Sequence, residues 1–238
     1  MANTTYDLES TTLERLFVRL NISKFHRIDC LSEQPKILLK RFFPRIKDER
    51  LRVAPCSFTD YSSVRLSQQR EIDIVTMARF VPGKGYDLLQ ELKEQISGFN
   101  LHCYGFGPLA SDLTFAHVGH ANDPFEVLGN AKIFLSLQRV NNYPSQSVLE
   151  AMASGCAIIA TDVGETRKFL NEDCAILIPY EAKALAIAID KLMNDETLRL
   201  RLGSRSREKV LRDFTVDRYA QYFMEEIIDF DYSHHHRP

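Results

Sequence analysis

The stretch 141–164 combines residue types that could bind an anion. Pro144 fits the first turn of a helix, where its missing N–H costs nothing, and Ser145 or Ser147 can accept a hydrogen bond from a free backbone N–H there. Gly155 then ends the helix, and a short apolar run suited to a buried strand follows. A helix start beside a strand end presents unpaired N–H groups and the positive end of the helix dipole, so this stretch predicts an anion site.

The same helix carries an acid close to its start. Val148, Leu149 and Met152 fall three and four positions apart, so they form one apolar stripe that can pack on a sheet. Glu150 lies between them, near the predicted N-terminus. An acid here either complements the helix dipole or faces a ligand.

Two basic residues follow another buried-strand pattern. The run 72–78 is apolar and β-branched, and Arg79 and Lys84 lie on the loop that comes next. They are either solvated surface charges or cations held at the end of a strand for an anionic ligand.

The elements that must position these residues alternate between strands and helices. An alternating pattern of this kind predicts an α/β fold with a doubly wound, mostly parallel sheet that binds ligands at the C-terminal ends of its strands. The strands are expected at 72–78, 101–105, 115–119, 131–137, 156–160 and 175–178, and the later helices at 88–95, 181–194, 196–214 and 216–230.

The chain before residue 71 follows a different pattern. An amphipathic helix is predicted around Leu13 to Leu20, then a short strand at 27–32, a helix between Pro35 and Pro44, and a strand at 51–55. We therefore expect a partial N-terminal α/β segment over 1–70, a sheet domain over 71–214, and a terminal helix and tail over 215–238. The aromatic and aliphatic residues of that terminal helix could share one face: Tyr219, Tyr222, Phe223, Ile227 and Phe230.

Composition limits the choice of partner and compartment. The chain is 45% hydrophobic and 26% charged, as in ordinary globular proteins, and its 30 basic and 32 acidic residues leave a net charge of -2 that favours neither nucleic acid nor anionic lipid. No apolar run approaches the roughly 20 residues of a membrane span, and we expect no transmembrane segment and no signal peptide. Five well-separated cysteines without a CxxC pair are expected to be buried thiols in a reducing, cytoplasmic compartment, and we expect no metal.

Two glycine motifs suggest other nucleotide sites and fit them poorly. Gly105-Phe-Gly107 resembles a dinucleotide-binding turn, but the next predicted strand begins near Phe115 and leaves no room for the required helix. Gly83-Lys84-Gly85 resembles part of a P-loop, but the P-loop pattern requires Gly at the position of Ala78 and Ser or Thr at the position of Gly85.

The stretch 141–164 also resembles the nucleotide-sugar-binding signature of the retaining glycosyltransferases with the GT-B fold, of the group 1 and family 4 type. The match runs in order through Leu149, Glu150, Ala151, Met152, Ala153, Gly155, Thr161 and Gly164. In the chain as a whole, the resemblance covers roughly residues 26–228. It implies a Rossmann-like donor-binding half of a GT-B fold, with the tail of the N-terminal domain before it.

The resemblance also implies roles for individual residues. Arg79 and Lys84 would contact the diphosphate of a nucleotide sugar, together with Gly107 and the helix start at Ser145, Ser147, Val148 and Leu149, while Glu150 would accept from the ribose hydroxyls. The first acid of the signature is missing: its position, catalytic in the family, is Asn142, with Asn141 as the alternative. An amide carries no charge to stabilise a developing oxocarbenium ion, so we expect altered handling of the sugar.

The predicted function is therefore transfer of a glycosyl group, of the hexosyl type, from a nucleotide-diphosphate sugar to an acceptor with retention. No cofactor or metal is expected. The acceptor is open, and we expect a partner domain, a partner chain or self-association, because the acceptor domain is largely absent. Two alternatives stay open: an inactive donor-binding module for regulation or assembly, and an unrelated doubly wound nucleotide-binding protein.

Overall fold

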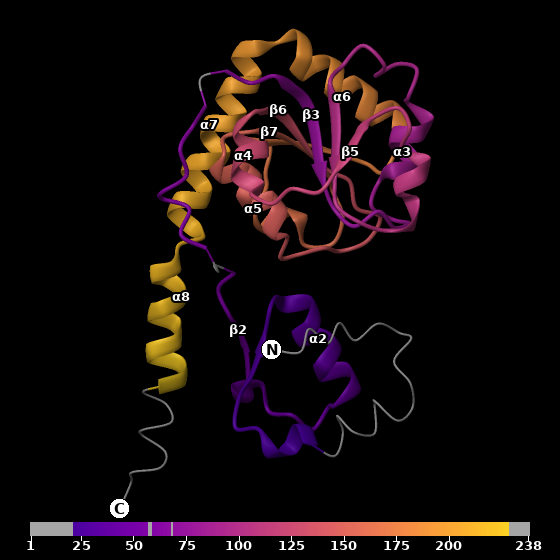
Figure 1. Ribbon diagram of the computed structural model, residues 1–238. Coiled ribbons are helices and arrows are strands. Elements are labelled where there is room, and N and C mark those ends of the chain that lie inside the picture. Colours follow the sequence, from indigo (N-terminus) through magenta and orange to yellow (C-terminus); the bar gives the residue numbers. More distant parts are fainter. Residues whose placement is uncertain (1–20, 57–58, 68, 229–238) are drawn as a thin grey trace, which may run out of the picture. The chain divides into compact units, whose positions relative to one another are not determined.

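The computed structural model of the chain describes residues 21–56, 59–67 and 69–228 (Figure 1). Two compact units make up the chain: residues 1–57 with 217–238, and residues 58–216. The units thus divide near residues 57 and 216, where we expected boundaries at 70 and 214. The helix expected around Leu13 to Leu20 and the terminal Phe230 lie outside the described residues.

The larger unit is built on one parallel sheet. Its six strands run in the order β5-β4-β3-β6-β7-β8, and every neighbouring pair is parallel. The fold class expected from the alternation is confirmed, and each strand end lies within two residues of its predicted position. The strands are β3 (Ile72–Met77), β4 (Leu101–Tyr104), β5 (His117–Gly119), β6 (Ala131–Ser136), β7 (Ala157–Thr161) and β8 (Ala175–Ile178).

Helices cover both faces of this sheet, which explains why the central strands are apolar on both sides. Helices α3 (Tyr86–Glu91) and α6 (Ala182–Asn194) share one core with the sheet, in which Leu89, Ile133 and Ile189 are buried. Helices α4 (Pro124–Gly129), α5 (Gln146–Ala153) and α7 (Glu196–Asp213) lie on the other face (Figure 1). No helix in the described ranges is long and apolar enough to cross a membrane.

The order of the strands creates a crevice at one end of the sheet. β3 and β6 are adjacent, yet the chain leaves β3 toward β4 on one side and leaves β6 toward β7 on the other. Loops that diverge from neighbouring parallel strands leave a crevice at their carboxyl ends. The loops after β3 and β6 carry most of the polar residues that the sequence singles out.

Three local expectations are corrected. Helix α3 begins at Tyr86 and ends at Glu91, because Gly85 at φ 79° serves as its N-cap and the residues after Leu92 form turns. Pro144 lies before α5 and outside it, after a cis peptide bond, and Ser145 is the N-cap without a side-chain hydrogen bond to the helix. The terminal helix α8 (Val216–Phe223) gives way to a π-helical turn at Met224–Ile228.

The smaller unit contains a two-stranded parallel sheet. The strands β1 (Ile28–Cys30) and β2 (Leu51–Val53) pair in parallel, with α2 (Glu33–Phe42) and two 3₁₀ turns, Ile22–Lys24 and Asp48–Arg50, around them. Ile22, Ile46 and Leu51 form its small core. The C-terminal segment joins the same unit through polar contacts: the hydroxyl of Tyr222 donates to Asp29 at 2.5 Å, and Arg27 pairs with Glu226 at 2.7 Å.

Candidate functional site

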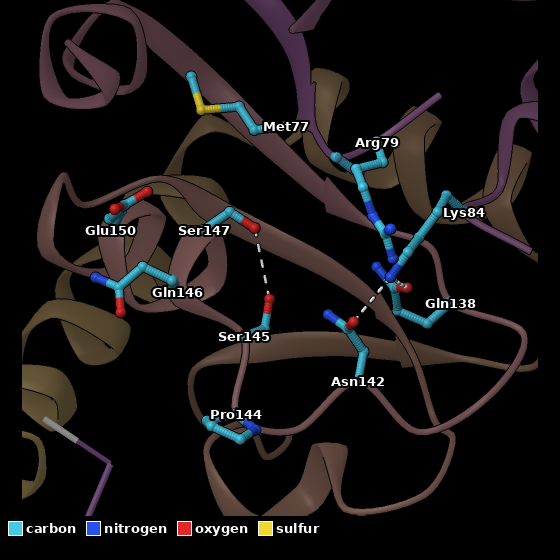
Figure 2. A pocket seen from close by; sticks show the side chains of 11 residues that line it. Met77, Arg79, Lys84, Gln138, Asn142, Pro144, Ser145, Gln146, Ser147 and Glu150 are labelled. Carbon is cyan, nitrogen blue, oxygen red and sulfur yellow. Dashed lines mark hydrogen bonds between the residues drawn. The ribbon is translucent and has the colours of Figure 1, made fainter. Parts of the chain in front are cut away.

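A cavity of about 390 Å³ lies at the carboxyl ends of β3 and β6, where the strand order opens the crevice (Figure 2). Six of the residues expected from the sequence line it together. The lining comprises Met77, Ala78, Arg79, Lys84, Gln138, Asn142, Pro144, Ser145, Gln146, Ser147 and Glu150. Residues separated by as many as 73 positions in the sequence thus face one space, because the loops after β3 and β6 and the start of α5 converge there.

Lys84 is held in this cavity by two neutral side chains. Its ammonium donates to the side-chain oxygen of Gln138 at 2.7 Å and to that of Asn142 at 2.8 Å (Figure 2). Burial, together with the positive charge of Arg79, lowers the pKa of Lys84 from its ordinary value. In the described part of the chain no carboxylate forms an ion pair with either cation. The site therefore carries positive charge that the protein does not neutralise.

Close packing holds the loop that bears Lys84. Gly85 has φ 79°, and a Cβ at that position would lie 2.1 Å from the Cβ of Leu137. The backbone N–H of Arg139 donates to the carbonyl of Gly83 at 3.0 Å, and the guanidinium of Arg139 pairs with Asp87 at 2.7 Å. The loop after β6 thus contacts both neighbours of Lys84, and through Arg139 it is also tied to the start of α3.

Gly107 does not line the cavity and instead supports the loop that carries Arg79. It has φ 144°, and a Cβ there would lie 2.5 Å from the carbonyl oxygen of Phe80. The N–H of Phe80 also donates to the carbonyl of Phe106 at 2.8 Å. Glycine at 107 allows the loop after β4 to approach the loop after β3 closely, and so it positions Arg79 from behind.

The start of α5 supplies backbone donors to the cavity. The N–H of Leu149 donates to the carbonyl of Ser145 at 3.2 Å, so the N–H groups before it stand outside the helical ladder. The side chains of Val148 and Leu149 are buried in the core, with 0% and 1% exposed. Neither Val148 nor Leu149 lines the cavity as expected, and of these two residues only Val148 has an N–H outside the helical ladder. Ser145 and Ser147 do line the cavity, with their hydroxyls 3.4 Å apart.

Glu150 lies on the opposite side of the cavity from Lys84 (Figure 2). Burial raises the pKa of its carboxyl, and Asp123 adds to that rise, while a hydrogen bond from the Gln146 side chain opposes it. Gln146 in turn donates to the hydroxyl of Tyr61 at 2.8 Å. A half-buried carboxylate with free acceptor capacity is suited to bind hydroxyl groups.

The structure separates the two asparagines that the sequence left as alternatives. Asn142 faces the cavity, whereas the Asn141 side-chain oxygen accepts from the backbone N–H of Glu165 at 3.0 Å. Gly164, at φ 56°, makes this approach possible, since a Cβ there would lie 2.4 Å from that of Asn141. Asn141 thus holds the loop after β7, and Asn142 lines the cavity.

Beyond the six predicted residues and Pro144, four lining residues were not predicted from the sequence: Met77, Ala78, Gln138 and Gln146. Gln138 follows the strand pattern at 131–137 directly, so the rule that ligands bind at strand ends could have found it. Met77 and Gln146 carry no such signal. Among the described residues, no group of three or more His, Cys, Asp or Glu side chains is placed to hold a metal ion.

Comparison with known proteins identifies the family. The profile of the family described as "Glycosyl transferase-like" matches residues 84–225, more than half of the chain. The chain belongs to this glycosyl transferase-like family. The match includes every residue of the cavity lining from Lys84 onward.

Two curated glycosyltransferases also resemble this chain. The chain is 28% identical over 169 residues to the capsular polysaccharide biosynthesis glycosyltransferase CapM of Staphylococcus aureus, a match that covers 63% of this chain and 43% of CapM. It is 23% identical over 165 residues to the lipopolysaccharide core biosynthesis glycosyltransferase LpsE of Rhizobium meliloti (strain 1021), covering 64% of this chain and 48% of LpsE. The matches thus span less than half the length of these two relatives.

The fold is also that of solved glycosyltransferase structures. Anabaena HepE, crystallised in complex with UDP and glucose, superposes with a TM-score of 0.76 at 14% identity, over 90% of this chain and 67% of HepE. The mostly parallel six-stranded sheet of the glycosyl transferase-like chain therefore has the GT-B type of architecture. In this chain the cavity lies at the switch point between β3 and β6.

Proposed function

We propose that this chain is the donor-binding half of a glycosyltransferase that uses a nucleoside-diphosphate sugar. The observation that carries the proposal is the pair of cations, Arg79 and Lys84, which no carboxylate neutralises within the described residues. A diphosphate brings about two negative charges and acceptor oxygens only, so it fits two unneutralised cations beside a helix start. HepE, a structural neighbour, was crystallised with UDP and glucose, which agrees with this choice of ligand.

Several lining residues then have a role in transfer. As the bond between the anomeric carbon and the phosphate oxygen breaks, its electron pair moves to the diphosphate, and Arg79 and Lys84 stabilise the charge that develops there. The N–H groups at the start of α5 contact the same phosphates. Glu150 accepts from the ribose hydroxyls. The acceptor hydroxyl forms the new bond on the face that the diphosphate leaves, its proton passes to the departing diphosphate oxygen, and the configuration is retained.

One observation favours a second candidate. Asn142 is uncharged, so the cavity lacks a carboxylate beside the sugar, and a donor-binding module without transfer activity would need none. The two candidates share ligand binding and differ only in turnover.

Calorimetric titration with uridine, guanosine and adenosine diphosphates tests the shared step. We expect one of them to bind, and we expect Lys84→Ala to weaken it, while Lys93→Ala, which removes an exposed lysine outside the cavity, leaves the affinity unchanged. Absence of binding by all three would overturn the proposal. With a bound nucleotide identified, an assay for sugar transfer and the anomeric configuration of the product distinguish the enzyme from the module.

A further inference from the structure

The cavity holds two amide side chains whose orientation is fixed by Lys84. An ammonium group can only donate hydrogen bonds, so the atoms of Gln138 and Asn142 at 2.7 and 2.8 Å from it are their oxygens. Both amide oxygens are therefore occupied by a protein donor. The NH₂ group of Asn142 points away from Lys84, toward the side of the cavity where Ser145 and Ser147 lie (Figure 2).

This arrangement offers a ligand hydrogen-bond donors near Asn142, and no carboxylate lies beside them. The NH₂ group of Asn142 has no hydrogen-bond partner within the described residues. The hydroxyls of Ser145 and Ser147 and the positive end of α5 lie on the same side of the cavity. Glu150, the one carboxylate in the lining, stands on the opposite side (Figure 2).

We propose that the sugar of the donor carries a carboxylate, as in a uronic acid, and that Asn142 selects for it. This inference rests on the proposed function and adds the class of sugar. A carboxylate only accepts hydrogen bonds, and bonds between an amide N–H and an ionised oxygen are about twice as strong as those to a neutral hydroxyl. An acid at position 142 would compete for Lys84 and repel a carboxylated sugar, whereas the amide removes that repulsion and supplies a donor.

The test compares matched neutral and acidic donors. Once the preferred nucleotide is known, calorimetry measures the wild-type affinity for UDP-glucose, UDP-N-acetylglucosamine and UDP-glucuronate, or for GDP-mannose and GDP-mannuronate. We expect the uronate donor to bind about tenfold more tightly than its neutral counterparts, the difference between a charge-assisted and a neutral hydrogen bond.

Two variants of neighbouring asparagines show whether position 142 is responsible. Asn142→Asp keeps the shape of the side chain, adds a negative charge in the cavity, and is expected to reverse the preference toward the neutral donor. Asn141→Asp adds the same charge one residue away, where the side-chain oxygen accepts from the N–H of Glu165, and should leave the uronate preferred.

The outcomes separate this inference from the proposed function. If a nucleoside diphosphate binds and Lys84→Ala weakens that binding, but neutral and acidic donors bind equally or the neutral donor binds better, the inference about the sugar is wrong and the proposed function stands. If the nucleoside diphosphate binds but no sugar nucleotide does, both the inference and the proposed use of a nucleotide sugar are wrong. An unchanged preference in Asn142→Asp would likewise refute the role of Asn142. If no nucleoside diphosphate binds, both fall together.

Discussion

The ammonium of Lys84 lies 2.8 Å from the side-chain oxygen of Asn142, a residue 58 positions further along the chain. The bond joins the loop after β3 to the loop after β6 across the switch point of the sheet. Because its acceptor is neutral, the bond orients Lys84 without cancelling its charge. An anionic ligand that replaces or joins this contact would meet a cation already in place. The entropy cost of ordering the Lys84 side chain on binding is therefore reduced.

The lowered pKa of Lys84 predicts how nucleotide binding depends on pH. Burial and Arg79 favour the neutral amine, so part of the Lys84 charge is lost below the ordinary lysine value of 10.5. A bound diphosphate restores the protonated form, so binding takes up protons in that range and affinity falls as the pH rises. Calorimetry in buffers of different ionisation enthalpy measures this uptake.

Lys84→Arg provides the control for this prediction, because a guanidinium stays charged throughout the range. The variant should lose the alkaline decline while it still binds nucleotide. A wild-type affinity that stays constant up to pH 10 or so would mean that Lys84 does not contact the diphosphate.

Glu150 should discriminate between ligands that have a ribose and ligands that do not. We expect Glu150→Gln to weaken the binding of a nucleoside diphosphate by roughly 10- to 100-fold, the range for hydrogen bonds to a charged group. The affinity for inorganic diphosphate should stay unchanged. Since burial raises the pKa of Glu150, the wild-type protein should lose the same contribution as the pH falls, beginning above the ordinary carboxyl value of 4.5. Competition binding measures both. Glu94→Gln at an exposed position is the control, and an equal loss for both ligands would mean that Glu150 acts through the fold.

The glycine behind Arg79 should be sensitive to a single methyl group. Gly107→Ala places a Cβ against the carbonyl of Phe80 at an unfavourable φ of 144°, so we expect a loss of about 1 to 3 kcal/mol in the free energy of unfolding. Gly98→Ala is the matched control, because a Cβ there meets nothing within 4 Å. Urea denaturation measures both variants. Equal stability would show that the loop after β4 adjusts without strain.

The smaller unit should associate with a partner or with itself. Helix α2 buries none of its residues, and Phe25 and Ile37 are 57% and 64% exposed. Exposed apolar surface of this kind marks interaction sites. We expect light scattering to report a mass above that of one chain and Ile37→Ser to shift it toward one chain. A single chain that transfers sugar unaided would contradict this expectation.

The sequence by itself determined the elements of the sheet and most of the candidate site. The apolar runs from Ile72 and Ala131 could only be buried strands, and the rule that ligands bind at strand ends then brought Arg79 and Lys84 to one edge. Helix ends were less well determined. Pro144 favours the first turn of a helix, yet it lies before α5, which begins at Gln146. The local preference of proline therefore did not determine where this helix begins.

Only the tertiary structure decided which residues line the cavity and which support its loops. The residues Asn141 and Asn142 are identical in type and adjacent, so no pattern in the sequence tells them apart. Packing does: Gly164 lies against Asn141, while Asn142 faces Lys84. Gly107 likewise matched a ligand-binding pattern, yet it lies behind Arg79 because the backbone of Phe80 fills the space beside it. These assignments depend on contacts between residues far apart in the chain, which composition and spacing do not contain.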